Sequence, residues 1–144
     1  NQLYPDLIPG LVKNEGIGFI LVDCDEYGPM IIGNKGTYYL RNDNIEGNNP
    51  LANYGKKAAE HIKRTNKFKY TPDILVISIY DPDKNEVAAF EELVGSHGGI
   101  GGEQSFPFIL HPAEWNIKDN IIGAEKVHQA FKTEILKINN ENLK

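Results

Sequence analysis

The spacing of apolar residues in the first 41 positions predicts a helix followed by three strands. Apolar residues at helical spacing between positions 7 and 12 predict a short helix near the N-terminus. Three strand-like runs follow, separated by turn residues of the kind that close hairpins: Ile17–Val22, Pro29–Ile32 and Thr37–Leu40. Residues 16–41 are therefore expected to form an antiparallel meander.

The remaining chain, over residues 50–140, alternates helical and strand-like patterns. After a polar loop, Asn42–Asn49, the pair Asn49-Pro50 has the chemistry of a helix start, and the apolar spacing predicts a helix to about Thr65. The almost wholly apolar run Asp73–Tyr80 is typical of a strand covered on both faces. Alternation of this kind predicts an α/β layer fold.

Three further elements complete the predicted α/β part. Asp83 and Glu86 have capping-box spacing, so a helix is expected to begin there and to end at Gly95. Phe106–Leu110 is expected to be a short strand, and apolar spacing from Val127 onward predicts an amphipathic C-terminal helix. The whole of residues 1–144 is expected to form one domain.

Composition limits the class of protein. The chain has 144 residues, of which 40% are hydrophobic and 24% charged, as in an ordinary globular domain. No apolar run approaches the roughly 20 residues that cross a bilayer. The net charge of −5 argues against a nucleic-acid binder, and Cys24, the only cysteine, excludes an internal disulfide and a thiolate zinc cluster. Since the chain starts at Asn1 and its only methionine is Met30, we expect it to be a segment of a longer polypeptide, whose compartment the sequence does not reveal.

One basic stretch stands out against this acidic background. Residues 56–69 carry six lysine or arginine residues and a single acid, Glu60, which gives a local charge of +5. Such a stretch can attract phosphate groups or an anionic membrane surface. A solvated helix face opposite the apolar face of the same helix is the favoured interpretation.

The glycine-rich stretch Ser96–Ser105 is the strongest candidate for chemistry. Ordering several glycines costs conformational entropy, so such loops occur where backbone approaches a ligand, a metal or other protein atoms closely. His97 is the one strong metal ligand or acid–base group within it. A tight surface turn with an incidental histidine is the alternative that residue types alone favour. His111, at the end of the expected strand, either lines the same cleft or hydrogen-bonds to backbone.

The sequence from Gly16 to about Trp115 resembles a known family. The pattern includes Gly16-Ile17-Gly18-Phe19, its densest part runs from Glu86 to Gly102 and contains Ser96-His97-Gly98-Gly99, and Phe106–Pro112 completes it. This resembles the C-terminal part of bacterial type I phosphodiesterase/nucleotide pyrophosphatase-like proteins of the alkaline phosphatase superfamily. Some relatives are described as membrane proteins with a holin-like N-terminal region, which leaves a membrane-anchored parent open.

The resemblance implies a fragment of an alkaline-phosphatase-like sheet with flanking helices, the meander being an insertion. It implies a two-metal phosphohydrolase site, usually zinc, in the full-length parent, with a phosphate ester as substrate. His97 matches a late metal ligand, and Gly98 and Gly99 would leave room for substrate. The nucleophile and the other ligands have no counterpart here, so we expect the remaining polypeptide to supply them. The isolated chain should then be inactive and bind no metal tightly. The alternative is a non-catalytic module that binds a ligand or a protein.

Overall fold

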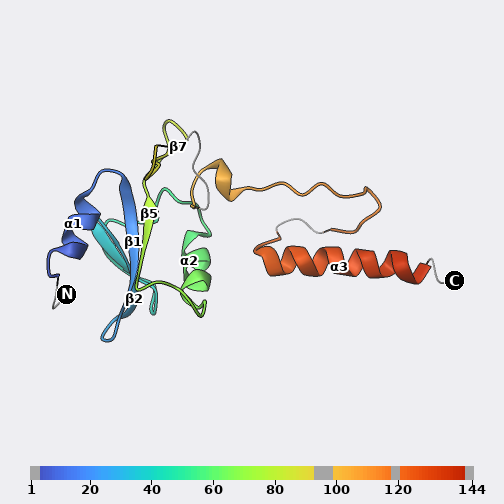
Figure 1. Ribbon diagram of the computed structural model, residues 1–144, viewed down its shortest axis with the longest axis horizontal. Coiled ribbons are helices and arrows are strands. Elements are labelled where there is room, and N and C mark those ends of the chain that lie inside the picture. Colours follow the sequence, from blue (N-terminus) through green and yellow to red (C-terminus); the bar gives the residue numbers. More distant parts are fainter. Residues whose placement is uncertain (1–3, 93–98, 118–120, 142–144) are drawn as a thin grey trace. The chain divides into compact units, whose positions relative to one another are not determined.

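Over its described residues, the protein is a mixed α/β chain of three α-helices, a five-stranded antiparallel sheet and a two-stranded hairpin. The computed structural model describes residues 4–92, 99–117 and 121–141 (Figure 1). The chain divides into two compact units, residues 1–107 and residues 108–144. The first unit contains the sheet, and the second contains the C-terminal helix.

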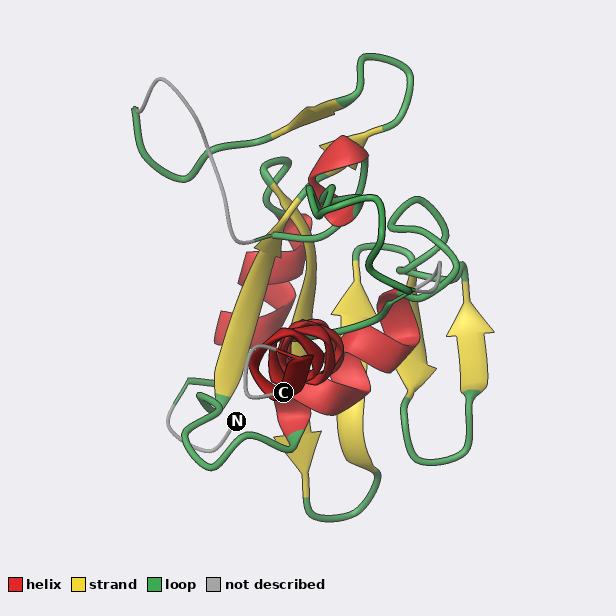
Figure 2. Ribbon diagram, turned by 90° about the vertical axis from the view of Figure 1, so that its right-hand side faces the viewer, coloured by secondary structure: helices red, strands yellow, loops and turns green. Residues whose placement is uncertain are grey.

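The first unit is organised around the antiparallel sheet, whose strands lie in the order β4-β3-β2-β1-β5 (Figure 2). The bounds are β1 Ile17–Cys24, β2 Gly28–Gly33, β3 Gly36–Tyr39, β4 Asn44–Gly47 and β5 Ile74–Ser78. The strands β1, β2 and β3 confirm the predicted meander. Its turns at residues 25–27 and 34–35 are those that the glycine, asparagine and acidic residues indicated.

The core lies between this sheet and α2 (Ala58–Asn66), while α1 (Leu7–Lys13) lies on the opposite side of the sheet (Figure 1). Because side chains alternate along a strand, Phe19 and Leu21 of β1 point toward α2 and Ile20 points the other way. Phe19 and Ile20 are fully buried. The core on the α2 side consists of Phe19, Leu21, Ile31, Leu40, Leu51, Tyr54, Ala58 and Ile62.

Two predictions fail in the middle of the first unit. The expected polar loop Asn42–Asn49 contains strand β4, whose four exposed residues lack the apolar alternation that marks a strand. The helix expected from Pro50 begins at Ala58 instead. The Asn49 Oδ1 atom accepts the Leu51 N–H at 2.9 Å, as in an N-cap, but here it closes a turn over residues 50–53.

A charged contact joins the turn before β4 to α2. Asp43 accepts hydrogen bonds from the Tyr38 hydroxyl, at 2.7 Å, and from the Lys63 ammonium group. Burial and the hydrogen bond to Asp43 raise the pKa of Tyr38 to about 12. The hydrogen bonds from Lys63 and Tyr38 lower the pKa of Asp43. Lys63 is thereby paired with an acid of the same unit.

Strand β5 confirms the strand predicted at Asp73–Tyr80, but its environment differs from the expectation. It pairs antiparallel with β1 and lies at one edge of the sheet, and all five of its residues are half-buried. Because side chains alternate between the two faces of a strand, both faces of β5 are covered, but only in part. An apolar run of five residues predicts that the strand is buried. It does not distinguish a central strand of a sheet from an edge strand that packs on a helix.

The helix expected from Asp83 to Gly95 is wrong over its described part. Residues 80–87 instead form a hairpin of β6 (Tyr80–Asp81) and β7 (Glu86–Val87). The Asp81 carboxylate accepts the N–H groups of Asp83 and Lys84, and Asn85 has a φ of 54°, in the left-handed region. Asparagine and aspartate tolerate such turn geometry, which explains why a capping-box spacing occurs here without a helix.

The second unit contains α3 (Ala124–Glu141), which confirms the predicted C-terminal helix. Trp115 packs edge-on against Phe131 of this helix, with ring centroids 5.7 Å apart. The expected strand Phe106–Leu110, which spans the boundary between the units, has neither helix nor strand structure. No described helix is both long and apolar enough to cross a membrane.

Candidate functional site

Of the predicted site residues, only Gly99 falls in the described chain. His97, the expected metal ligand, and Gly98, an expected substrate contact, lie outside the described residues. Gly99 is half-buried, and the Gln104 side chain is the group nearest to the point where a Cβ would stand, at 3.5 Å. The structure therefore describes the glycine-rich stretch from Gly99 onward, as residues 99–105.

Contacts with aromatic side chains of the first unit explain two glycines of this stretch, Gly101 and Gly102. Gly101 has a φ of 100°, and a Cβ there would meet Tyr54 and Tyr80 atoms at 3.1 Å. Gly102 has a φ of 61°, and its Cβ would lie 2.6 Å from the Tyr80 ring. Both positions thus require glycine for conformation and for space. The close approach inferred from the glycines is, at these two positions, an approach to protein.

Local hydrogen bonds hold the described part of the glycine-rich stretch, residues 99–105. The Gly101 N–H donates to Ser105 Oγ at 2.8 Å, and the Gln104 amide donates to the Ile100 carbonyl at 3.2 Å. Ile100 packs against the core, and Glu103–Ser105 form a single 3₁₀ turn. Residues 99–105 are consequently attached to the core of the first unit through Ile100.

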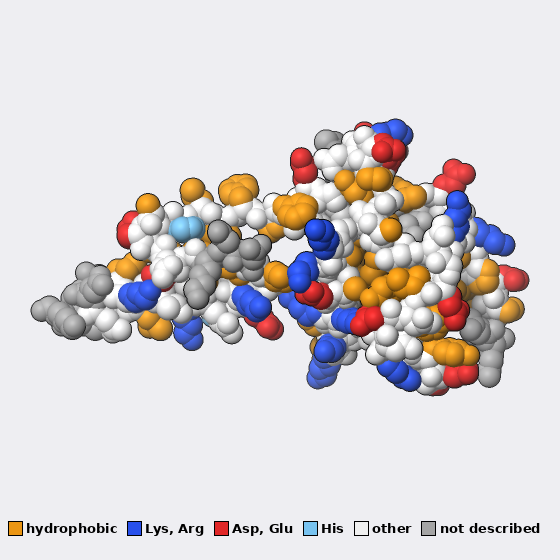
Figure 3. Space-filling view, turned by 180° about the vertical axis from the view of Figure 1, so that it is seen from behind, with side chains coloured by type: hydrophobic (Ala, Val, Ile, Leu, Met, Phe, Trp, Pro, Cys, Tyr) orange, Lys and Arg blue, Asp and Glu red, His pale blue; other side chains and the backbone are white. Residues whose placement is uncertain are grey.

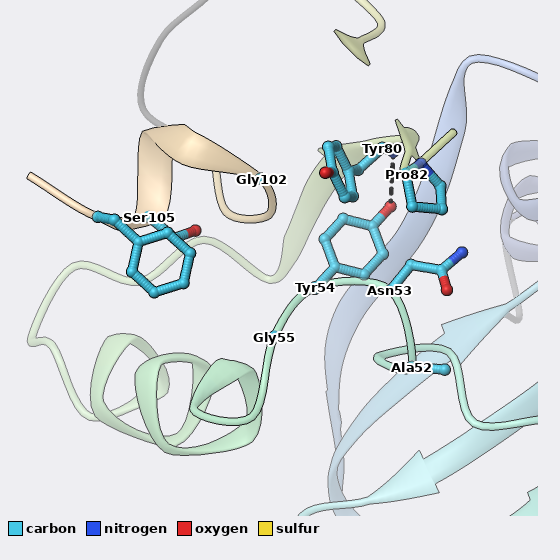
Figure 4. A pocket seen from close by; sticks show the side chains of 9 residues that line it. Ala52, Asn53, Tyr54, Gly55, Tyr80, Pro82, Gly102 and Ser105 are labelled. Atoms are coloured by element: carbon cyan, nitrogen blue, oxygen red, sulfur yellow. Dashed lines mark hydrogen bonds between the residues drawn. The ribbon is translucent and has the colours of Figure 1, made fainter. Parts of the chain in front are cut away.

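Tyr54 is the residue on which this arrangement depends. Its hydroxyl accepts the Tyr80 N–H at 3.3 Å (Figure 4). The same hydroxyl donates to the Ser78 carbonyl at 2.9 Å. The ring is buried, and it meets Phe19 edge-on with centroids 4.9 Å apart. Burial raises the pKa of Tyr54, although the hydrogen bond from Tyr80 opposes that shift. Tyr54 therefore joins the core, the end of β5 and the start of β6.

An open pocket of about 370 Å³ lies beside these residues (Figure 4). Its wall combines the Tyr54 and Tyr80 rings with a neutral amide from Asn53 and a hydroxyl from Ser105. The full lining is Ala52, Asn53, Tyr54, Gly55, Tyr80, Pro82, Gly102, Ser105 and Phe106. No lining residue is charged, so the pocket suits an uncharged group with an apolar or aromatic face and one or two hydrogen-bonding atoms.

Tyr80 contacts the chain on both sides of the His97 motif. Val87 of β7 is paired with Tyr80 in the hairpin, and Gly101 and Gly102 pack on the Tyr80 ring. Tyr80 therefore contacts the chain before the motif, at Val87, and after it, at Gly101 and Gly102. Sequence reasoning did not identify Tyr54 or Tyr80 as organising residues, because only the tertiary contacts distinguish them from other core aromatics.

Two other chemically capable residues, His111 and Asp81, make local hydrogen bonds. His111 Nδ1 lies 2.8 Å from the Pro112 carbonyl, which matches the backbone-bonded alternative. The Asp81 carboxylate is engaged in the hairpin turn. Among residues 4–92, 99–117 and 121–141, no three histidine, cysteine or acidic side chains are close enough together to hold a metal ion.

Comparison with known proteins adds no assignment. No protein-family model, curated protein or solved structure matches the chain. The support for any function therefore comes from the residues and their geometry.

The Tyr54 hydroxyl provides a direct test of this architecture. Tyr54→Phe removes the partner of the Ser78 carbonyl and of the Tyr80 N–H, so we expect a loss of about 1–3 kcal/mol in the free energy of unfolding. Urea denaturation followed by circular dichroism measures it.

Tyr80→Phe is the matched control for this experiment. It deletes one exposed hydrogen bond, to Asn85 at 3.0 Å, which water can replace. We therefore expect this control to lose less than about 1 kcal/mol. Equal losses in the two variants would contradict the organising role of the Tyr54 hydroxyl.

Proposed function

We propose that this chain is the C-terminal portion of a metal-dependent phosphodiesterase or related phosphohydrolase. In this proposal it forms part of an alkaline-phosphatase-like fold and is inactive by itself. His97 acts as a late metal ligand, and Gly98 and Gly99 leave room for a phosphate-ester substrate. The metal is divalent, with zinc as the expected ion, and the rest of the polypeptide supplies the other ligands and the nucleophile.

The observation that carries the proposal is the anchoring of the chain around the histidine motif. Tyr80 is paired with Val87 of β7, before the motif, and its ring contacts Gly101 and Gly102, after the motif. Loops that are held at both ends by a rigid sheet are common carriers of ligand-binding and catalytic residues. The Ser96-His97-Gly98-Gly99 sequence lies between these two contacts along the chain, and its glycines add no side chains that would obstruct a substrate.

A second observation supports a site completed by further polypeptide. Phe106, Phe108 and Leu110 are 79%, 91% and 90% exposed, although they follow the two-residue period of a strand. No backbone hydrogen bond joins residues 107–111 to any described residue. Exposed apolar side chains in such a row are typical of a surface that another part of the protein covers. In the proposal, this segment becomes a strand of the larger sheet.

The chemistry of His97 fits zinc but does not complete a zinc site. Neutral imidazole is a preferred zinc ligand, and catalytic zinc usually takes three protein ligands and keeps one open position. One histidine is one of those three ligands. Zinc would supply Lewis-acid stabilisation of the phosphate oxygens, and this chain would contribute one imidazole and a loop that admits the substrate.

Metal removal from the full-length polypeptide tests the proposal. We expect it to hydrolyse bis(p-nitrophenyl) phosphate, to lose that activity in EDTA and to regain it when zinc is added, because the ion stabilises charge that develops on the phosphate. Residues 1–144 alone should show neither hydrolysis nor stoichiometric zinc binding by calorimetry.

Two results would contradict this proposal. Hydrolysis that persists in EDTA would exclude a metal-dependent reaction. Tight stoichiometric zinc binding by residues 1–144 would show a complete site in this chain and would favour the alternative, an independent ligand-binding module.

A further inference from the structure

A short turn after α2 combines exposed aromatic rings with cations. The turn follows Asn66, the last residue of the helix, and contains Lys67, Phe68, Lys69 and Tyr70. Phe68 is 54% exposed and Tyr70 is 84% exposed. We call Arg64 and residues 67–70 together the basic aromatic turn.

Hydrogen bonds fix the shape of this turn. The Thr71 hydroxyl donates to the Thr65 carbonyl at 2.6 Å, and the Thr71 N–H donates to the Phe68 carbonyl at 3.1 Å. The Phe68 N–H in turn donates to the Thr65 carbonyl at 3.0 Å. Because these bonds tie the backbone of the turn, the backbone has little conformational freedom left to lose when the turn binds a partner.

Two of the three cations of the turn contact its rings, and none of the three forms an ion pair with a described residue. The Arg64 guanidinium lies 5.6 Å from the centre of the Phe68 ring, and Lys69 Nζ lies 5.1 Å from the centre of the Tyr70 ring. Arg64, Lys67 and Lys69 belong to no salt bridge within the described ranges, whereas Lys57 and Lys63 are paired with Glu60 and Asp43. Three positive charges thus remain available to a partner.

The charge of the turn contrasts with that of the chain. Residues 61–72 contain four lysine or arginine residues and no acid, while the complete chain has a net charge of −5. Lysine and arginine side chains also gather along the side of the larger unit in the space-filling view (Figure 3). The surface is therefore complementary to a local negative charge, and the rings add apolar contact.

We infer that the basic aromatic turn binds an anionic lipid surface and attaches the protein peripherally to a membrane. Basic residues are attracted to the negative charge of acidic headgroups, and aromatic side chains favour the boundary between headgroups and acyl chains. This inference concerns a surface outside the pocket and does not depend on the proposed hydrolase function.

The ring contacts favour a lipid surface over a nucleic acid. Single-stranded nucleic acids stack their bases on free ring faces along a continuous positive groove. Here each ring already has a cation against one face, and the three cations of the basic aromatic turn lie within residues 64–69. A headgroup layer requires neither a free ring face nor a long basic groove.

Vesicle sedimentation with residues 1–144 tests the inference. We expect binding to vesicles of phosphatidylcholine with 30% phosphatidylglycerol, roughly tenfold weaker binding to pure phosphatidylcholine, and loss of binding in high salt. The charge reversal Lys67→Glu with Lys69→Glu should weaken binding to the anionic vesicles at least about tenfold. The ring variant Phe68→Ser with Tyr70→Ser should also weaken binding to the anionic vesicles. The salt dependence of its binding should change less than that of the Lys67/Lys69 variant.

The double variant Lys126→Glu with Lys132→Glu is the matched control, since it makes the same charge change at positions of α3. It should bind like the unaltered chain, and thermal melting of every variant checks folding. Equal binding by the Lys67/Lys69 variant and the control would overturn the inference. So would equal binding to both vesicle types, or tighter binding to a 20-nucleotide oligothymidine than to anionic vesicles.

Discussion

Replacement of His97 by alanine in the full-length polypeptide should nearly abolish zinc-dependent phosphodiester hydrolysis. In the proposed function His97 is a direct ligand, and the loss of one imidazole leaves the zinc undercoordinated. Loss of groups that merely orient a zinc ligand typically costs 10–100-fold in affinity or activity, so we expect at least about a 100-fold loss in kcat/KM. Hydrolysis of bis(p-nitrophenyl) phosphate and the zinc content of the purified protein are the two measurements.

His128→Ala is the matched control, because His128 is exposed on α3 and has no proposed role. It should retain activity within about twofold. Thermal melting separates a lost ligand from a lost fold. Full activity of the His97 variant at normal zinc content would exclude the metal-ligand assignment.

Replacement of Phe19 by alanine should remove a large part of the stability of the first unit. The ring is completely buried in the middle of β1 and meets Tyr54 edge-on, so truncation leaves a cavity between the sheet and α2. Substitutions of this kind cost about 3–5 kcal/mol in the free energy of unfolding. Domains of ordinary stability have about 5–15 kcal/mol in total, so the variant should unfold at a much lower urea concentration.

Phe106→Ala provides the control for this second experiment, because it removes the same ring from a position that is 79% exposed. We expect a change within about 0.5 kcal/mol. Urea denaturation followed by circular dichroism measures both variants. A similar midpoint for the two would contradict the assignment of Phe19 to the core.

Elements with strong local signals were predictable from the sequence. The meander of β1, β2 and β3 has clear turn residues between its apolar runs, and α1 and α3 have regular apolar spacing. Strand β4 has no such pattern, because its residues are exposed and it is held mainly by pairing with β3. Pairing between strands is a tertiary property that a polar four-residue segment does not reveal.

The mistaken helix positions share a physical cause. An asparagine or aspartate side chain accepts a nearby backbone N–H both at a helix start and in a turn. Asn49 makes such a bond within a turn, and in the hairpin the bond is made by Asp81 and not by Asp83, from which the helix was predicted. Other contacts, such as the pairing of Tyr80 with Val87, decide whether a helix or a turn comes after the bond.

The candidate site was predictable only in part. The glycine-rich stretch indicated close backbone approach, and Gly101 and Gly102 do approach other atoms closely. Those atoms belong to Tyr54 and Tyr80, which lie 47 and 21 residues before Gly101 in the chain, so spacing alone could not identify them. The assignments of His97, Gly98 and Gly99 remain predictions from the motif.

The position of the Tyr54 hydroxyl also limits how this sequence can diverge. A Cβ at Gly18 would overlap that oxygen, and a Cβ at Gly101 would lie 3.1 Å from the same ring. A side chain at position 18 therefore requires a smaller residue at position 54, and that residue would no longer bridge Ser78 and Tyr80. Positions 18 and 54 should thus covary, whereas position 101 should keep its glycine, because its φ of 100° and its contact with Tyr80 do not depend on the residue at position 54.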